Sequence, residues 1–327
     1  MRVRPIKSSA GYTVAGLITD QSFDTIKERD YIEATREYGI LVMKQPRNVD
    51  TKAWVDFQMK VGYHQAAEIW CNDPEFPQIF RVTNKKLSGE QEGLFGHGEL
   101  DWHCNILFTP DSEEIVSLRA LEVPRGSRTD CANSIPFWNQ LSQEKKDLYR
   151  RTKFRFTNKM EETYENKLAH YVLPTEEMKD FDKKRANKKI QGCMNYNEAD
   201  DAFPESRFSK TGFHHLVPKH PLGIEGIYFP HLNMSYLCDT YHNPYDDHRA
   251  MYEEIKKEYL DSGKYTYQHE WETGDIIFME QLSGVHRRNN VWQEQDLDPD
   301  AEKNPRELQR TAFWYKKKFR SHCGYCI

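Results

Sequence analysis

The spacing of apolar residues predicts two helices and a strand near the start of the chain. In residues 24–38, Ile26, Ile32 and Ala34 can share one face of a helix. Gly39 follows, as is typical of a helix C-terminus. The apolar run 40–44 then predicts a short strand, and residues 51–62 form a second amphipathic pattern that ends at Gly62.

Later segments alternate between strand and helix patterns. Residues 106–120, 226–229, 274–280 and 309–319 are β-like, and the turn at residues 273–275 introduces the third of them. Residues 244–261 are helix-like. Residues 140–212 are rich in Lys and Glu and mostly helical in pattern, which predicts a helical insert or lid. We expect an antiparallel barrel or jelly roll with helical decoration.

Composition narrows the class of protein. Of the 327 residues, 38% are hydrophobic, 30% charged and 13% aromatic, which is typical of a globular protein. We find no apolar run of about 18 residues and no leader-like segment, and we expect no membrane partner. The net charge of −5 argues against a nucleic-acid partner and favours a small-molecule substrate.

Seven cysteines, an odd number at sparse spacing, do not form a disulfide framework and indicate the reducing cytoplasm. The one CxxC pattern, at Cys323 and Cys326, is interpreted as an ordinary tail. We find neither a repeat nor a linker that would divide the chain, so we expect one domain over residues 1–327.

Two of the thirteen histidines, His103 and His286, lie at predicted strand ends. An Fe(II) site that activates O₂ uses two imidazoles and usually one carboxylate on one face. Residues at i and i+2 of a strand point the same way, so His-x-Asp makes an efficient ligand pair. Here the i+2 residue is Asn105. Taken alone, the position of His103 favours an ordinary half-buried histidine over a metal ligand.

Six blocks in order resemble the taurine dioxygenase-like (TauD/TfdA) family of Fe(II)/2-oxoglutarate-dependent oxygenases. The blocks cover most of residues 14–316, and they are 32–62, LDWHCNILF (100–108), 121–144, 214–230, WETGDIIFMEQLSGVH (271–286) and PRELQRTAFWY (305–315). The resemblance implies a double-stranded β-helix (jelly roll, cupin-like) core.

The resemblance also implies roles for single residues. His103 and His286 take the positions of the two histidine ligands of Fe(II), and Thr129 that of a threonine that contacts 2-oxoglutarate. A closing arginine binds the distal carboxylate of 2-oxoglutarate, because a guanidinium fork matches a carboxylate. Arg310 is the favoured candidate for this role, and Arg306 is the alternative.

Two positions depart from the family pattern. Asn105 replaces the acidic iron ligand, and a neutral amide is a weaker ligand than a carboxylate. Glu99 or water is the alternative third ligand. Sulfonate-binding members have an arginine four residues after the closing arginine. Counted from Arg310 that residue is Trp314, which argues against a sulfonate substrate.

The implied activity is an oxygenase that uses Fe(II), 2-oxoglutarate and O₂ and releases succinate and CO₂. Hydroxylation of a small polar metabolite, with amino acids among the candidates, is the first hypothesis. Asn105 raises two alternatives, a halogenase and a non-catalytic binding protein of the same fold. A homo-oligomer is compatible with the sequence.

Overall fold

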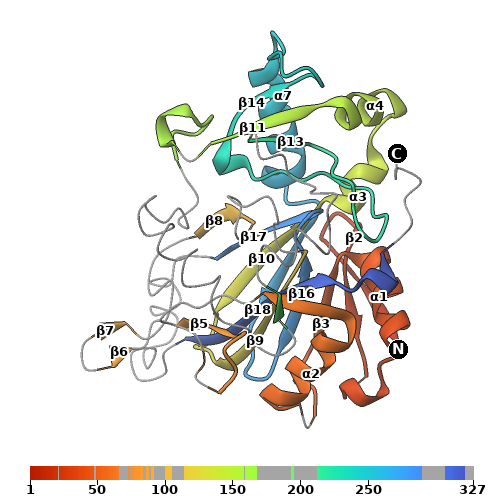
Figure 1. Cartoon of the computed structure of the whole chain (residues 1–327), viewed down its shortest axis with the longest axis vertical. Coiled ribbons are helices and arrows are strands. Elements are labelled where there is room, and N and C mark those ends of the chain that lie inside the picture. Colours follow the sequence, from red (N-terminus) through yellow and green to blue (C-terminus); the bar gives the residue numbers. More distant parts are fainter. Residues whose placement is uncertain are drawn as a thin grey trace.

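The computed structural model describes residues 1–20, 22–47, 49–65, 73, 75–83, 86–87, 90–91, 100–104, 114–157, 159–167, 193–194, 212–288 and 306–320. Within these ranges the chain is mainly β, with a few short helices around two large sheets (Figure 1).

The larger sheet has nine strands in the order β1-β2-β3-β16-β9-β18-β4-β12, and β5 also pairs with β18. Most neighbours are antiparallel, but β2 and β3, and β12 and β4, run parallel. The strands are β1 (Val3–Lys7), β2 (Thr13–Ile18), β3 (Ile40–Met43), β4 (Gly62–Gln65), β5 (Phe80–Thr83), β9 (Ile115–Glu122), β12 (Cys193–Met194), β16 (Ile276–Glu280) and β18 (Glu307–Tyr315).

Both faces of this sheet are covered, so β3 is apolar at every position, and β16 at every position before Glu280, rather than at every second one. In β3 and β16, Leu41 and Phe278 face helices α1 (Glu28–Tyr38) and α2 (Thr51–Val61). Val42 and Met279 face the opposite way, into the space between the sheets. The two helices therefore cover the outer face of the sheet.

The second large sheet has four antiparallel strands in the order β15-β10-β17-β8. Their bounds are β8 (Leu100–His103), β10 (Arg128–Asn133), β15 (Thr266–Glu270) and β17 (Gly284–Arg288). It faces the larger sheet, since Cys131 Sγ of β10 lies 3.5 Å from Met279 Sδ of β16. The space between the two sheets holds the apolar core and, at one end, the candidate site.

A third layer forms a cap at one end of the two sheets (Figure 1). Its three-stranded sheet has the order β13-β11-β14, and its helices share a core rich in aromatic side chains. The elements are α3 (Ser134–Gln140), α4 (Gln143–Arg151), β11 (Lys153–Phe156), β13 (Phe213–His215), β14 (Met234–Cys238) and α7 (His248–Ile255), which continues as a π-helix over Lys256–Asp261.

Several short elements complete the described residues. They are a β6–β7 hairpin (Lys86–Leu87 and Glu90–Gln91) and 3-10 turns η1 (Phe23–Thr25), η2 (Met160–Glu162), η3 (His231–Asn233) and η5 (Lys317–Phe319). No helix among the described residues combines the length and the apolar character needed to span a bilayer.

The predicted elements near the N-terminus are confirmed. α1 begins at Glu28, four residues later than expected, and Gly39 ends it with φ 65°. α2 ends at Val61, because Gly62 already belongs to β4. The strand predicted at 274–280 is β16, and the turn before it contains Gly274 at φ 93°.

Other expectations need correction. The strand expected at 226–229 is wrong, because Ser134 Oγ hydrogen-bonds both the N–H and the C=O of Ile227 and takes the place of a strand partner. Within 140–212, α4 is helical as expected, but residues 153–156 form strand β11 between β13 and β14. Residues 168–192 and 195–211 lie outside the described residues.

Two further strands are shorter than expected. β9 begins at Ile115, and residues 105–113 of the 106–120 prediction lie outside the described residues. β18 ends at Tyr315 rather than at 319, because a 3-10 turn follows it.

Gly39 offers a test of how closely the junction between α1 and β3 packs against α3. A Cβ at Gly39 would meet Ile135 Cδ1 at 2.9 Å, whereas one at Gly263 (φ 66°) would meet nothing within 4 Å. We expect Gly263→Ala to lower the free energy of unfolding by about 1 kcal/mol through backbone strain. Gly39→Ala should cost about 2 to 3 kcal/mol, because crowding is added. Urea unfolding measures both, and equal losses would show that the contact with Ile135 is relieved without cost.

Candidate active site

The two histidines singled out from the sequence lie directly opposite each other. His103 is the last residue of β8 and pairs in register with His286 in β17. Their ring centroids are 4.3 Å apart with 53° between the planes, and both side chains are buried. Residues 183 positions apart in sequence thus present two imidazoles to one point.

Both imidazoles are suited to bind a metal ion. His103 Nδ1 lies 2.6 Å from the carbonyl oxygen of Asp101, a hydrogen bond that keeps the proton on Nδ1 and the lone pair on Nε2. Burial lowers the pKa of His103 to about 4, helped by the positive charges of Arg288 and Arg310. Burial also holds the pKa of His286 well below its usual range. At neutral pH both rings are therefore neutral, as metal binding requires.

These histidines line a pocket between the two large sheets. The same pocket is lined by Thr129 of the four-stranded sheet, by Arg310 of the nine-stranded sheet and by Arg306, which immediately precedes β18. Five of the six site residues predicted from the sequence are thus brought together. The sixth, Asn105, lies outside the described residues, as does the alternative ligand Glu99. The apolar walls are formed by Val82, Leu100, Leu118 and Leu308.

The two candidate arginines have different contacts. Arg306, just before β18, donates from Nη2 to Thr129 Oγ1 at 3.3 Å. Arg310 lies within β18 and lines the same pocket, with its guanidinium 5.0 Å from the ring centroid of Phe80. Both side chains are buried.

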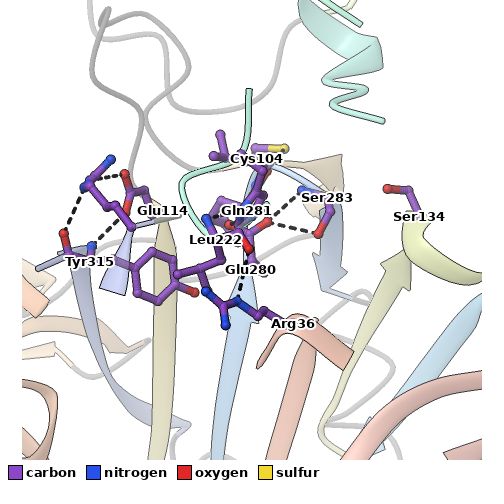
Figure 2. Close-up of polar contacts among 12 residues, drawn as sticks. Arg36, Cys104, Glu114, Ser134, Leu222, Glu280, Gln281, Ser283 and Tyr315 are labelled. Atoms are coloured by element: carbon purple, nitrogen blue, oxygen red, sulfur yellow. Dashed lines mark hydrogen bonds and ion pairs between the residues drawn. The ribbon is translucent and has the colours of Figure 1, made fainter. Parts of the chain in front are cut away.

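A buried carboxylate shapes the turn that leads from β16 to His286. Glu280 Oε2 accepts hydrogen bonds from the backbone N–H groups of Leu282 and Ser283 and from Ser283 Oγ (Figure 2). Glu280 Oε1 lies 2.8 Å from His220 Nε2, and both side chains are almost completely buried. The carboxylate thereby fixes the start of β17.

Cys104 ties the two histidine-bearing strands together. Its thiol donates to the carbonyl oxygen of Gly284 at 3.4 Å and to that of Gln281 at 3.7 Å, and Figure 2 shows it beside Gln281. Burial, and then the charge of Glu280, raise the pKa of this thiol, so it stays protonated. Cys104 therefore acts as a hydrogen-bond donor to the backbone at the start of β17.

The sequence reasoning missed two arginines that follow His286. Arg287 and Arg288 also line the pocket, and Arg287 Nε contacts Asp130 Oδ2 at 2.9 Å. The spacing could have predicted Arg288, because a residue two positions after His286 on a strand lies on the same face.

The side chains of the site are of the types that bind an Fe(II) ion and an anionic co-substrate. Two neutral imidazoles converge, and an arginine hydrogen-bonded to a threonine lies in the same buried pocket. Among the described residues, no His, Cys, Asp or Glu joins His103 and His286 to make a group of three.

A family model described as "Taurine catabolism dioxygenase TauD, TfdA family" matches residues 3–312 of the chain. The chain belongs to this family. As a member, the protein is an Fe(II)- and 2-oxoglutarate-dependent dioxygenase whose partners are a small-molecule substrate, 2-oxoglutarate and O₂.

Similar proteins extend over almost the whole chain. A pentalenolactone F synthase from Streptomyces arenae is 24% identical over 295 residues, which cover 88% of this chain and 90% of that protein. One from Streptomyces avermitilis is 21% identical over 289 residues, 86% of each.

Two solved structures share the fold. A taurine dioxygenase from Burkholderia xenovorans aligns with a TM-score of 0.61 at 12% identity, covering 96% of this chain and 89% of that one. AAD-2 in complex with Mn(II) and N-oxalylglycine aligns with a TM-score of 0.58 at 13% identity, covering 97% and 98%.

Glu280→Gln tests the turn that precedes His286. His220 Nδ1 accepts from the Leu222 N–H, so Nε2 carries the proton that faces Glu280. A Gln amide that keeps the three hydrogen bonds of the turn would turn its NH₂ toward this donor. We expect a loss of about 2 kcal/mol in the free energy of unfolding, the typical cost of a buried unsatisfied donor.

Glu253, whose side chain is 49% exposed, provides the control. Glu253→Gln should leave stability within about 0.5 kcal/mol of the wild type. Chemical denaturation of both variants measures the difference, and an unchanged Glu280→Gln variant would contradict the role given to this carboxylate.

Proposed function

We propose that this protein hydroxylates a small polar metabolite, with one oxygen atom of O₂ entering the substrate and the other entering succinate as 2-oxoglutarate loses CO₂. The observation that carries the proposal is one pocket in which His103 and His286 face the Arg306–Thr129 pair.

We expect a single domain with a double-stranded β-helix core, a lid within residues 140–212 and a cytoplasmic location. Cys104, Cys131 and Cys238 are free thiols, which is typical of that location.

His103 and His286 are the residues that would hold the iron, with Asn105 as the proposed third ligand. When bound, Fe(II) supplies the activation of O₂ that no amino-acid side chain provides. The chain's contribution is to present two neutral imidazoles and to keep water away with the apolar side chains Leu100, Leu118 and Leu308.

We assign the distal carboxylate of 2-oxoglutarate to Arg306 and Thr129. A planar guanidinium binds a carboxylate through two N–H groups, and a neighbouring hydroxyl can donate a third hydrogen bond. Arg306 is supported over Arg310 because it is the arginine that contacts Thr129.

This assignment changes the expectation for the substrate. If Arg306 is the closing arginine, the residue four positions after it is Arg310. Sulfonate-binding members of the family have an arginine at that position. Arg310 lines the pocket and its charge acts on both histidines. We therefore propose a substrate with a carboxylate or sulfonate group, which includes amino acids.

Halogenation is the second candidate function, and the neutral residue at position 105 is what favours it. Halogenases of this superfamily also lack the acidic iron ligand, although they have Gly or Ala at that position.

Turnover tests the proposed function. Purified protein with Fe(II), 2-oxoglutarate and O₂ should form succinate faster when a panel of small carboxylates and sulfonates is added, and one product should gain an oxygen atom. A product that gains chlorine only when chloride is present would replace hydroxylation by halogenation. A pool that raises succinate formation without an oxidised product would contradict both.

Conservative arginine variants test the two assignments. Arg306→Lys keeps the charge but loses the fork, so we expect the Kd for 2-oxoglutarate to rise about 10- to 100-fold. Arg310→Lys should leave this Kd within about threefold and raise the KM for the primary substrate instead. Calorimetric titration and initial rates measure the two constants, and the opposite pattern would make Arg310 the anchor.

A further inference from the structure

We infer that Trp271 is a positioning residue for 2-oxoglutarate that acts through the hydroxyl group of Thr129. Trp271 follows β15 and lies behind the pocket, where its indole Nε1 donates to Thr129 Oγ1 at 2.9 Å. The inference rests on the proposed function, since it requires that Thr129 faces the carboxylate of 2-oxoglutarate.

The hydrogen bonds of Thr129 decide where its proton can go. A hydroxyl group has two lone pairs and one proton. The oxygen of Thr129 accepts from Trp271 Nε1 and from Arg306 Nη2, which occupies both lone pairs. None of the described residues accepts the proton in return. Since Thr129 lines the pocket, its O–H is directed to donate into it, which is the direction a carboxylate oxygen needs.

Trp271 itself is held in place on several sides. Its side chain is 4% exposed, and its backbone N–H donates to the carbonyl oxygen of Ser127 at 2.9 Å. Its ring packs edge-on against His269, with centroids 4.4 Å apart and 83° between the planes. In turn, His269 Nδ1 shares a hydrogen bond of 2.7 Å with the hydroxyl of Tyr267.

A buried carboxylate fixes the other side of His269. His269 Nε2 lies 3.2 Å from Asp275 Oδ2, and Asp275 is fully buried. Asp275 also pairs with Lys44 Nζ at 2.6 Å and accepts from the Gln45 N–H at 3.1 Å. A continuous series of contacts therefore runs from the partly exposed Lys44 through Trp271 to the hydroxyl that faces the pocket.

The shape of the surrounding space determines which variant isolates the hydrogen bond. Trp271 also lines a separate cleft of about 510 Å³ together with Lys44, Arg125 and Glu272. A small residue at 271 would join this cleft to the space behind Thr129 and admit water. Phenylalanine keeps an aromatic wall and removes only the N–H donor and part of the ring.

Trp54 supplies a matched control. It is fully buried, and its Nε1 donates to Ser117 Oγ at 3.1 Å, the same type of bond made to a residue that does not line the pocket. Trp271→Phe and Trp54→Phe should therefore lose similar stability. Only Trp271→Phe should weaken the binding of 2-oxoglutarate.

The experiment is anaerobic calorimetric titration of 2-oxoglutarate into the Fe(II)-loaded full chain, together with steady-state rates. We expect Trp271→Phe to raise the Kd for 2-oxoglutarate about 3- to 10-fold, the equivalent of one net hydrogen bond, with the primary-substrate KM unchanged. Trp54→Phe should stay within twofold of the wild type. Thr129→Val should weaken binding, Thr129→Ser should restore it, and Trp271→Phe combined with Thr129→Val should be no worse than Thr129→Val alone.

The outcomes separate the inference from the function on which it rests. If Thr129→Val weakens binding but Trp271→Phe does not, the role of Trp271 is overturned and that of Thr129 stands. If Thr129→Val binds 2-oxoglutarate as the wild type does, the assignment of Thr129 fails.

The wild-type protein offers a second test, by NMR, that does not depend on a stable variant of Thr129. Of the seven indole N–H resonances, that of Trp271 should shift as 2-oxoglutarate is added, and an unchanged resonance would overturn the inference.

Discussion

The site depends on the register between β8 and β17. Side chains alternate along a strand, so a slip of one residue would turn His286 to the opposite face of the sheet, away from His103. The chain fixes this register beside the pair itself. At the start of β17, Gly284 lies close to the end of β16, and a Cβ there would lie 2.9 Å from the carbonyl oxygen of Glu280. The Cys104 thiol then joins the two strands.

The two sheets contribute different chemistry to the space between them. The four-stranded sheet supplies the imidazoles and the threonine, and β18 of the nine-stranded sheet, with the residue just before it, supplies Arg310 and Arg306. Burying a guanidinium costs free energy unless opposite charge or hydrogen bonds compensate for it. A dianionic co-substrate brings charge of the opposite sign, so the two arginines make the pocket selective for anions.

Local patterns were sufficient to predict α2, β3 and β16, because each is specified by its own period, cap or turn. The prediction failed at residues 226–229, where the partner of Ile227 is the side chain of Ser134. Nothing in the neighbouring sequence indicates a contact across 93 positions. In the site, too, some features could be predicted from the sequence and others depend on contacts between distant residues. The resemblance identified His103, His286 and Thr129, but the contact that distinguishes Arg306 from Arg310 is a property of the folded chain.

The thiol next to His103 has a consequence for the durability of the protein. Oxidants attack the thiolate form of cysteine far more readily than the protonated thiol. Cys104 is buried, donates its proton to backbone carbonyl groups and lies near the negative charge of Glu280, and each of these disfavours ionisation. An enzyme that consumes O₂ at a ferrous ion thus keeps the cysteine adjacent to His103 in the form that resists chemical damage over many turnovers.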